Sequence, residues 1–194
     1  MNETATLPPA AREVLHFWFG DEDVARPEWF RKDPAFDDAI RQRFGALVEQ
    51  ALAGGLAEWA ATPEGALARI LLLDQFTRNI FRDTPRAFQG DPLALAAAHA
   101  LVESGAERTL TPRQRTFVYL PLEHAESREM QAEAMRLFGA LAEEHPQTAD
   151  SLEWAAKHQV IIERFGRFPH RNLQLGRVST DEERAFLLGP DLSF

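Results

Sequence analysis

The sequence of 194 residues contains no cysteine and no hydrophobic run longer than a few residues. Without cysteine there can be no disulfide, thiolate metal ligand or cysteine nucleophile, so a metal site would need histidine and carboxylate ligands. The strongest apolar run, residues 70–73, is far shorter than the about 20 residues of a membrane-spanning helix, so we expect no membrane partner. The N-terminus also lacks the basic region and apolar core of a secretory signal. We therefore expect a soluble, cytoplasmic protein.

Lysine is rare as well, because Lys32 and Lys157 are the only lysines among 21 basic residues and the rest are arginines. Arginine is the better side chain for partly buried ion pairs and for two-pronged contacts with carboxylates or phosphates, although codon usage alone could also produce this bias. The 30 acidic residues give the chain a net charge of -9. Because an acidic protein repels phosphate backbones at long range, we expect no nucleic-acid partner.

Helix signals recur along the chain, and no stretch alternates as a strand would. Pairs of a capping residue and a proline, as in Asp33-Pro34 and Thr62-Pro63, open amphipathic segments that end at glycines. Near the C-terminus, Thr180 and Glu183 form a capping-box pattern. The predicted helices cover residues 8–20, 33–54, 62–80, 91–105, 111–119, 127–145 and 151–165, with a short one from residue 180.

These elements predict an all-α fold of seven or eight helices packed as antiparallel helical hairpins. The length suits a single helical domain, residues 1–194, in which residues 1–8 form a flexible N-terminus and residues 181–194 a short capping helix and tail. No period near 34 residues is visible, so the expected architecture is tetratricopeptide-like without clear sequence repeats.

The first polar cluster is the segment LLLDQFTRNIFR, residues 71–82. Asp74 and Arg78 are spaced i and i+4 on a helix, and they share a face with the apolar stripe. One interpretation is a half-buried salt bridge between helices. The other is the wall of a pocket, in which Arg78 and Arg82 address an anion.

The second cluster is YLPLEHAE, residues 119–126. Pro121 removes an amide donor and clashes with the preceding turn, so we predict that the helix kinks or stops near Tyr119 and that residues 122–126 face the interior or a cleft. Glu123, His124 and Glu126 follow within one turn, and a histidine between carboxylates can act as a general base. As a metal motif this spacing is weak, and we predict no metal site.

The third cluster spans residues 154–172. His158 shares a helix face with apolar residues, so it is either a core histidine or a functional one. No acidic residue lies between Glu163 and Asp181, and Gly166 and Pro169 shape the segment between them. The basic side chains there either bind an anion or pair with carboxylates and helix ends elsewhere. They are Arg164, Arg167, His170, Arg171 and Arg177.

The phrases HFWFG, LLLDQFTRNIFR, PLEHAE, HQVIIERFGRFPHRN and LGRVST, in this order, resemble a bacterial family known as domain of unknown function 924. The resemblance extends from residue 16 to about residue 180. It implies a helical fold of the tetratricopeptide-like superfamily, and it implies no activity, cofactor or catalytic residue.

We predict that these clusters converge, so that residues among Asp74, Arg78, Glu123, His124 and His158 lie within hydrogen-bonding distance across helices, because a buried charge without a partner is costly. The leading hypothesis is a binding module whose polar pocket holds a small anion or a peptide carboxylate. Two alternatives stay open. One is an enzyme that acts on an anionic substrate. Phosphate-binding loops, nucleophile elbows and HExxH motifs are missing, so such an enzyme would use histidine and carboxylate acid-base chemistry or a histidine and carboxylate metal site. The other is a scaffold that binds a protein partner, and the sequence identifies no cofactor.

Overall fold

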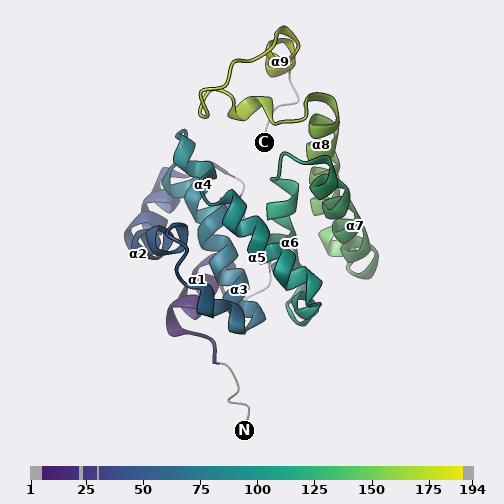
Figure 1. The fold of residues 1–194 in the computed structure, drawn as a ribbon. Coiled ribbons are helices and arrows are strands. Elements are labelled where there is room, and N and C mark those ends of the chain that lie inside the picture. Colours follow the sequence, from purple (N-terminus) through teal and green to yellow (C-terminus); the bar gives the residue numbers. More distant parts are fainter. Residues whose placement is uncertain (1–5, 22–23, 30, 190–194) are drawn as a thin grey trace.

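A computed structural model describes residues 6–21, 24–29 and 31–189, and within these ranges the chain is helical and forms no strand. None of the helices in the described part is long and apolar enough to cross a membrane. The expected all-α fold is therefore confirmed (Figure 1). The α-helices are α1 (Pro9–Phe19), α2 (Pro34–Leu52), α3 (Pro63–Leu71), α4 (Thr77–Ile80), α5 (Asp91–Glu103), α6 (Pro112–Glu123), α7 (Arg128–Glu144), α8 (Ala149–Phe165) and α9 (Asp181–Leu187).

Capping side chains begin several of these helices as the sequence predicts. Asp33 accepts hydrogen bonds from the first amides of α2, and Thr62 accepts one from the amide of Gly65 at the start of α3. Thr180 and Glu183 exchange the two hydrogen bonds of a capping box at α9. These bonds satisfy amides that the helix itself leaves unpaired, which fixes where each helix starts.

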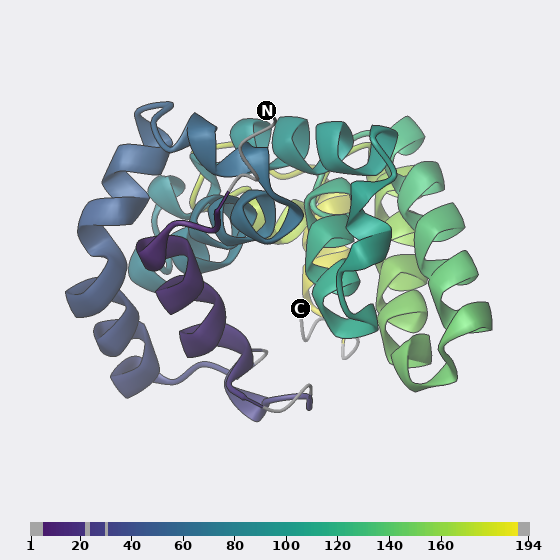
Figure 2. The ribbon, with the colours of Figure 1, turned by 90° about the horizontal axis from the view of Figure 1, so that it is seen from below.

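The helices form an arc, with α2 at one end and the α7–α8 pair at the other (Figure 2). In its middle α3 packs against α1, α5 and α6, and α6 packs against α7. The main core holds tilted and edge-on aromatic rings, among them Trp18, Phe44, Phe76 and Phe117. The segment after α8 folds back onto the end of that helix, where Phe168 packs with Ile161 and Ile162 of α8 in a second, smaller core. This return places the loop after α8 beside the start of α5, where Arg171 contacts Asp91, a residue 80 positions earlier in the chain.

Two local features differ from the prediction. The helix expected over residues 62–80 is interrupted by a π-helical turn, Leu72–Phe76, between α3 and α4. The break expected at Pro121 is wrong in its position, because α6 continues through Pro121 and ends at Glu123. Proline costs a helix one amide bond and about 3 kcal/mol, but Phe117 and Leu122 bury their side chains in the same turns and offset that loss. Of residues 122–126, which are expected to face inward, Leu122 and Glu123 are buried and Glu126 is exposed, so the expectation is confirmed only for the start of this segment.

Candidate functional site

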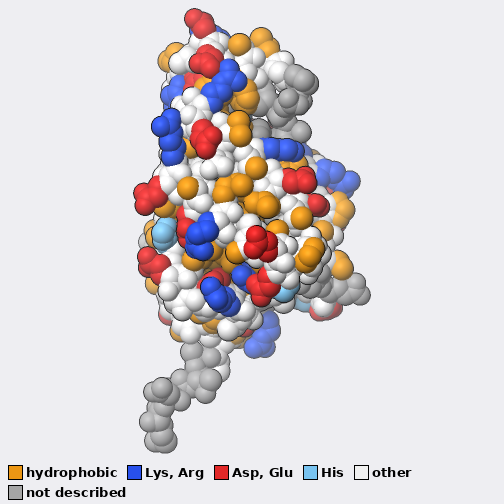
Figure 3. All heavy atoms as spheres, turned by 90° about the vertical axis from the view of Figure 1, so that its right-hand side faces the viewer, with side chains coloured by type: hydrophobic (Ala, Val, Ile, Leu, Met, Phe, Trp, Pro, Cys, Tyr) orange, Lys and Arg blue, Asp and Glu red, His pale blue; other side chains and the backbone are white. Residues whose placement is uncertain are grey.

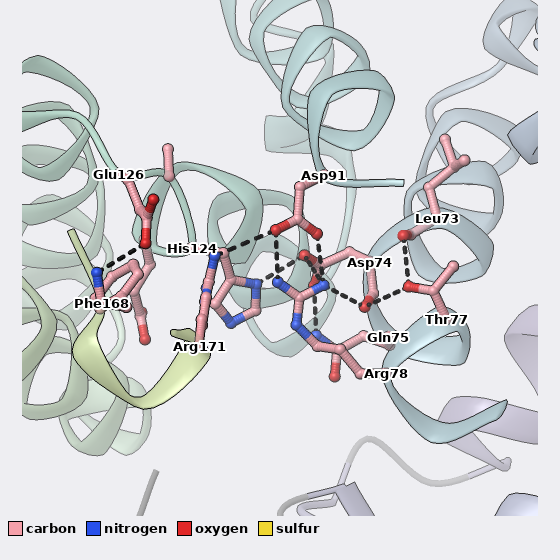
Figure 4. Close-up of polar contacts among 12 residues, drawn as sticks. Leu73, Asp74, Gln75, Thr77, Arg78, Asp91, His124, Glu126, Phe168 and Arg171 are labelled. Atoms are coloured by element: carbon pink, nitrogen blue, oxygen red, sulfur yellow. Dashed lines mark hydrogen bonds and ion pairs between the residues drawn. The ribbon is translucent and has the colours of Figure 1, made fainter. Parts of the chain in front are cut away.

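Five polar residues from separate segments meet where the ends of these helices come together (Figure 4). Asp74 lies on the π-helical turn, Arg78 on α4, Asp91 at the first position of α5, His124 at the C-terminal cap of α6, and Arg171 in the loop after α8. We call these five residues the polar cluster. Their contacts confirm that the sequence clusters around Asp74 and His124 converge in space.

Asp74 is the most deeply buried acid of the polar cluster, at 1 % exposure. Its carboxylate accepts a hydrogen bond from the Gln75 amide at 2.5 Å and lies 3.2 Å from a guanidinium nitrogen of Arg78. The carboxylate oxygen Oδ1 is also 2.7 Å from Nδ1 of His124. Burial would raise the pKa of Asp74, but Arg78 and His124 outweigh burial and hold that pKa well below its usual range. Asp74 is therefore an ionised carboxylate inside the protein.

The contact between His124 and Asp74 fixes the proton of the imidazole. An ionised carboxylate can only accept a hydrogen bond, so Nδ1 of His124 is the donor. Burial lowers the pKa of His124; Asp74 opposes this and Arg78 adds to it. The ring is therefore neutral at pH 7, and its other nitrogen, Nε2, carries the lone pair.

Asp91 joins the two arginines of the polar cluster. Arg78 donates two hydrogen bonds to it, at 2.8 and 3.1 Å, in the two-pronged geometry of a strong arginine–carboxylate pair. Arg171 donates one longer hydrogen bond of 3.4 Å to the same carboxylate. Asp91 is thus mainly the partner of Arg78, and Arg171 is weakly paired.

Arg171 is almost completely buried, at 6 % exposure. Its guanidinium carbon lies 4.8 Å from the ring centre of Phe88 and 4.5 Å from that of Phe168. Burial and repulsion by Arg78 lower its pKa to about 10. Burial and the Arg171 charge lower the pKa of the adjacent His170 to about 3, so this histidine is neutral. Arg171 is consequently a buried cation beside two aromatic rings, the neutral His170 and the charged Arg78, with one long bond to an acid.

A second carboxylate–imidazole pair lies beside the first. Glu123 Oε1 is 2.9 Å from Nδ1 of His158, and the same nitrogen is 2.9 Å from the Trp154 carbonyl oxygen one turn earlier. The rings of His124 and His158 have centres 6.2 Å apart. The inward orientation expected for His158 is confirmed, since its side chain is 12 % exposed.

Other residues predicted for the site lie elsewhere and have partners of their own. Glu126 accepts hydrogen bonds from Arg177 and from the Phe168 amide, so it holds the C-terminal loop in place instead of facing the polar cluster. Of the arginines expected to bind an anion, Arg82 pairs with Asp37 on α2, Arg164 with Glu182 and Arg167 with Glu183. For Arg164 and Arg167, the alternative of pairing with acidic residues is the one observed.

Sequence reasoning missed Asp91, Gln75, Phe88 and Phe168. Asp91 precedes a proline and has the pattern of a helix cap, but α5 begins at Asp91 itself with Gly90 at the cap, and the carboxylate turns to Arg78. The aromatic residues carry no polar signal at all. Only the return of the C-terminal loop brings Phe168 and Arg171 to Phe88, and no local pattern encodes that contact.

A metal ion needs a group of acidic and histidine side chains, and a larger ligand needs a groove to hold it. Among residues 6–21, 24–29 and 31–189, no group of three or more histidine, aspartate or glutamate side chains could hold a metal ion. A groove of about 510 Å³ lies away from the polar cluster, between the segment before α3 and the α5 helix. Its lining is mostly alanine, which offers few polar contacts to a cofactor.

Comparison with known proteins matches the chain to a family described as bacterial proteins of unknown function (DUF924), over residues 14–191. The chain is also similar to a solved structure of a protein of unknown function, ATU0120, from Agrobacterium tumefaciens. The two are 39% identical with a TM-score of 0.82, and the match covers 91% of this chain and 96% of that one. No curated protein matches the chain.

Proposed function

Because the chain belongs to the DUF924 family, whose description assigns no activity, we propose a function from its own residues: it is a binding module that holds a small anion, a carboxylate or a phosphate, on Arg171. The ligand would lie beside the polar cluster, next to Arg78 and His124. Its source would be a free metabolite or the C-terminal carboxylate of a peptide.

The observation that carries this proposal is the poor pairing of Arg171. A guanidinium has five N–H donors, and removing it from water is costly unless they find acceptors. In Arg171 the Nε hydrogen has no acceptor among the described residues, and the one bond to a carboxylate is 3.4 Å long. A bound anion would supply the missing acceptors in the two-pronged geometry that arginine prefers.

The surroundings of Arg171 support a ligand in a second way. The rings of Phe88 and Phe168 hold the guanidinium in one orientation, so binding would cost little side-chain entropy. Low exposure also strengthens the attraction, because opposite charges interact more strongly away from water. A weakly paired but immobilised cation is typical of a prepared anion site.

We exclude nucleic acid from this proposal. The net charge of -9 opposes phosphate polymers, whereas a small anion needs only one favourable site. On the side of the molecule formed by α7 and α8, acidic, basic and hydrophobic side chains are interspersed, and basic side chains form no continuous stripe (Figure 3).

Ligand-dependent melting tests the proposal. The wild type would be heated with increasing inorganic phosphate, acetate or acetyl-alanyl-alanine, beside Arg171→Met and the control Arg164→Met, whose arginine pairs with Glu182 at the surface. A ligand that binds only the folded state stabilises it by about 2.7 kcal/mol at 100 times its Kd, so a saturable rise of several degrees is expected in the wild type and the control. No saturable rise with any of the three, or an equal rise in Arg171→Met, would refute the proposal.

A further inference from the structure

We infer that the Asp74–His124 pair is the general base of an enzyme and that its substrate is a small ester carrying a carboxylate or phosphate group that Arg171 holds. This inference rests on the proposed anion site and adds a reaction to it. Neither the family description nor the similar solved structure assigns such a reaction.

The first argument is the geometry of the pair itself. The 2.7 Å contact leaves Nε2 of His124 as the basic nitrogen, with a buried carboxylate behind the ring to stabilise the imidazolium that forms when Nε2 takes a proton. Gln75 and Arg78 hold that carboxylate from its other sides. An oriented imidazole with an ionised carboxylate on Nδ1 is the arrangement that hydrolases use to activate an oxygen nucleophile.

The second argument is the backbone that carries Asp74. The π-helical turn, Leu72–Phe76, interrupts a helix whose sequence favours regular α-helical spacing throughout. Single π turns inside helices cost stability and are found often at functional sites. Here the turn contains Asp74, which holds the His124 ring, and Gln75, which donates a hydrogen bond to the Asp74 carboxylate.

The third argument is the second pair. Glu123 and His158 repeat the carboxylate–imidazole arrangement, and the two rings lie 6.2 Å apart. A salt-bridge network that served only stability would need neither imidazole, because the arginines already pair with Asp74 and Asp91. Two oriented imidazoles beside a buried guanidinium provide a base, a neighbouring proton carrier and an anchor for a charged substrate.

The proposed step is hydrolysis. Nε2 of His124 takes a proton from a water molecule while the water oxygen forms a bond to the ester carbonyl carbon. The tetrahedral intermediate then breaks the bond to the leaving oxygen, which receives the proton from the imidazolium, so the products are an acid and an alcohol. Asp74 stays ionised throughout, and water is the co-reactant.

The rate should depend on pH through His124, because only the neutral ring can accept the proton. Activity should be lost as the pH falls through the pKa of His124, which burial holds below its ordinary value. Charged and titratable groups surround this ring. Asp74 from the π turn, Arg78 from α4 and Glu123 from α6 act on it electrostatically, as does His170 from the C-terminal loop. The His158 ring of α8 is 6.2 Å away, and Asp91 of α5 and Arg171 lie beside it in the polar cluster (Figure 4).

The test measures release of 4-nitrophenol from 4-nitrophenyl succinate and from 4-nitrophenyl phosphonoacetate, two carboxylic esters that carry a carboxylate and a phosphonate group, with succinate binding followed separately. The wild type should hydrolyse one of the two esters. His124→Gln should lower kcat by at least about 100-fold with succinate binding retained, and Asp74→Asn should lower kcat and alter the pH profile. His16→Gln, which changes an exposed histidine, should leave the rate unchanged.

Nitrogen NMR of the histidine rings gives an independent measurement should a variant fold poorly. The inference requires a proton on Nδ1 of His124 and a bare Nε2 in the wild type at neutral pH. The opposite tautomer, or hydrolysis of neither ester by a protein that binds succinate, would overturn the inference and leave the anion site standing. If the wild type binds neither succinate nor phosphate, the proposed function itself fails.

Discussion

Arg171 carries its charge in a place that burial makes unfavourable for a cation. Burial and repulsion by Arg78 lower its pKa in the folded protein to about 10, below the ordinary value of 12.5, so folding disfavours the charged form. The cost is constant below pH 10 and disappears as the pH rises from about 10 towards 12.5.

Replacing Arg171 with methionine should therefore leave the free energy of unfolding at pH 7 unchanged or raise it. Methionine keeps an unbranched stem between Phe88 and Phe168, and Asp91 keeps its two short bonds to Arg78. Urea unfolding at pH 7 measures the change. A loss of several kcal/mol would mean that the arginine holds the fold together and has no need of a ligand.

Asp74→Asn should have the opposite effect on stability. A buried charge network that loses one partner is destabilised by about 3 kcal/mol. The folded pKa of Asp74 is depressed, so its contribution is complete above the unfolded value of 3.8 and is lost as the pH falls towards the folded value. Urea unfolding of both proteins between pH 7 and pH 3 gives the difference between their free energies of unfolding, and this difference should narrow below about pH 3.8. Equal free energies of unfolding at pH 7 would contradict the description of Asp74 as an ionised carboxylate.

The π-helical turn depends on a close approach between two segments. A methyl group added at Gly90 would lie 2.1 Å from the Leu73 carbonyl oxygen, which also accepts the hydroxyl hydrogen of Thr77. The backbone of the π turn thus fills the space where any other residue at position 90 would place its side chain.

Gly90→Ala should consequently destabilise the protein by about 1 to 3 kcal/mol, since one of the two segments must move. Gly139→Ala is the matched control, because that glycine lies inside α7 with no atom within 4 Å of the added methyl, and alanine is favoured in a helix by about 1 kcal/mol. Thermal unfolding of the two variants should shift in opposite directions. An equal effect of both substitutions would show that the contact with Leu73 is unimportant.

The C-terminal helix α9 is held by one buried acid. Glu183 accepts hydrogen bonds from Arg167 at 2.6 and 2.8 Å and from Asn172 at 3.3 Å. The Arg167 bonds, opposed by burial, lower the pKa of Glu183 to about 2. The contribution of ionised Glu183 to the free energy of unfolding is therefore complete above its unfolded pKa of 4.5 and is lost as the pH falls towards about 2.

Glu183→Gln should loosen α9, and amide hydrogen exchange over residues 181–187 measures the effect. We expect exchange about tenfold faster at pH 7, which corresponds to about 1.4 kcal/mol. Glu182→Gln is the control, because its partner Arg164 lies at the surface and exposed pairs contribute little. If the amides of residues 181–187 exchange at the same rate in the two variants, the hydrogen bonds of Glu183 do not anchor the helix.

Helix starts and the existence of most helices could be predicted because their signals are local. The caps at Asp33, Thr62 and Thr180 act on amides within three residues, so sequence alone contains the whole interaction. The end of α6 could not be placed, because burial of Phe117 in the tertiary structure overrides the local cost of Pro121. The π turn has no local signal of this kind.

The candidate site was predictable only in part for the same reason. Asp74 and His124 stand out in the sequence as polar residues on inward helix faces. A buried charged group needs a hydrogen-bonding partner, so a contact between them could be expected. Asp91 has the sequence pattern of a helix cap, and Phe88 carries no polar signal. Their roles depend on Arg171, which reaches them only because the chain returns after α8.

The molecule as a whole brings together residues from positions 74 to 171, and the C-terminal loop completes the polar cluster that the helices begin (Figure 4). Glu126 binds both Arg177 and the Phe168 amide, so it fixes this loop against the end of α6. The site is thus a property of the assembled fold, and no single helix contains it.

Calorimetric titration of inorganic phosphate and of succinate into the purified protein at low ionic strength tests the anion site most directly. The wild type and Arg164→Met should bind one of these anions at one site per chain, and Arg171→Met should bind neither. Absence of binding by the wild type, or unchanged binding by Arg171→Met, would contradict the account.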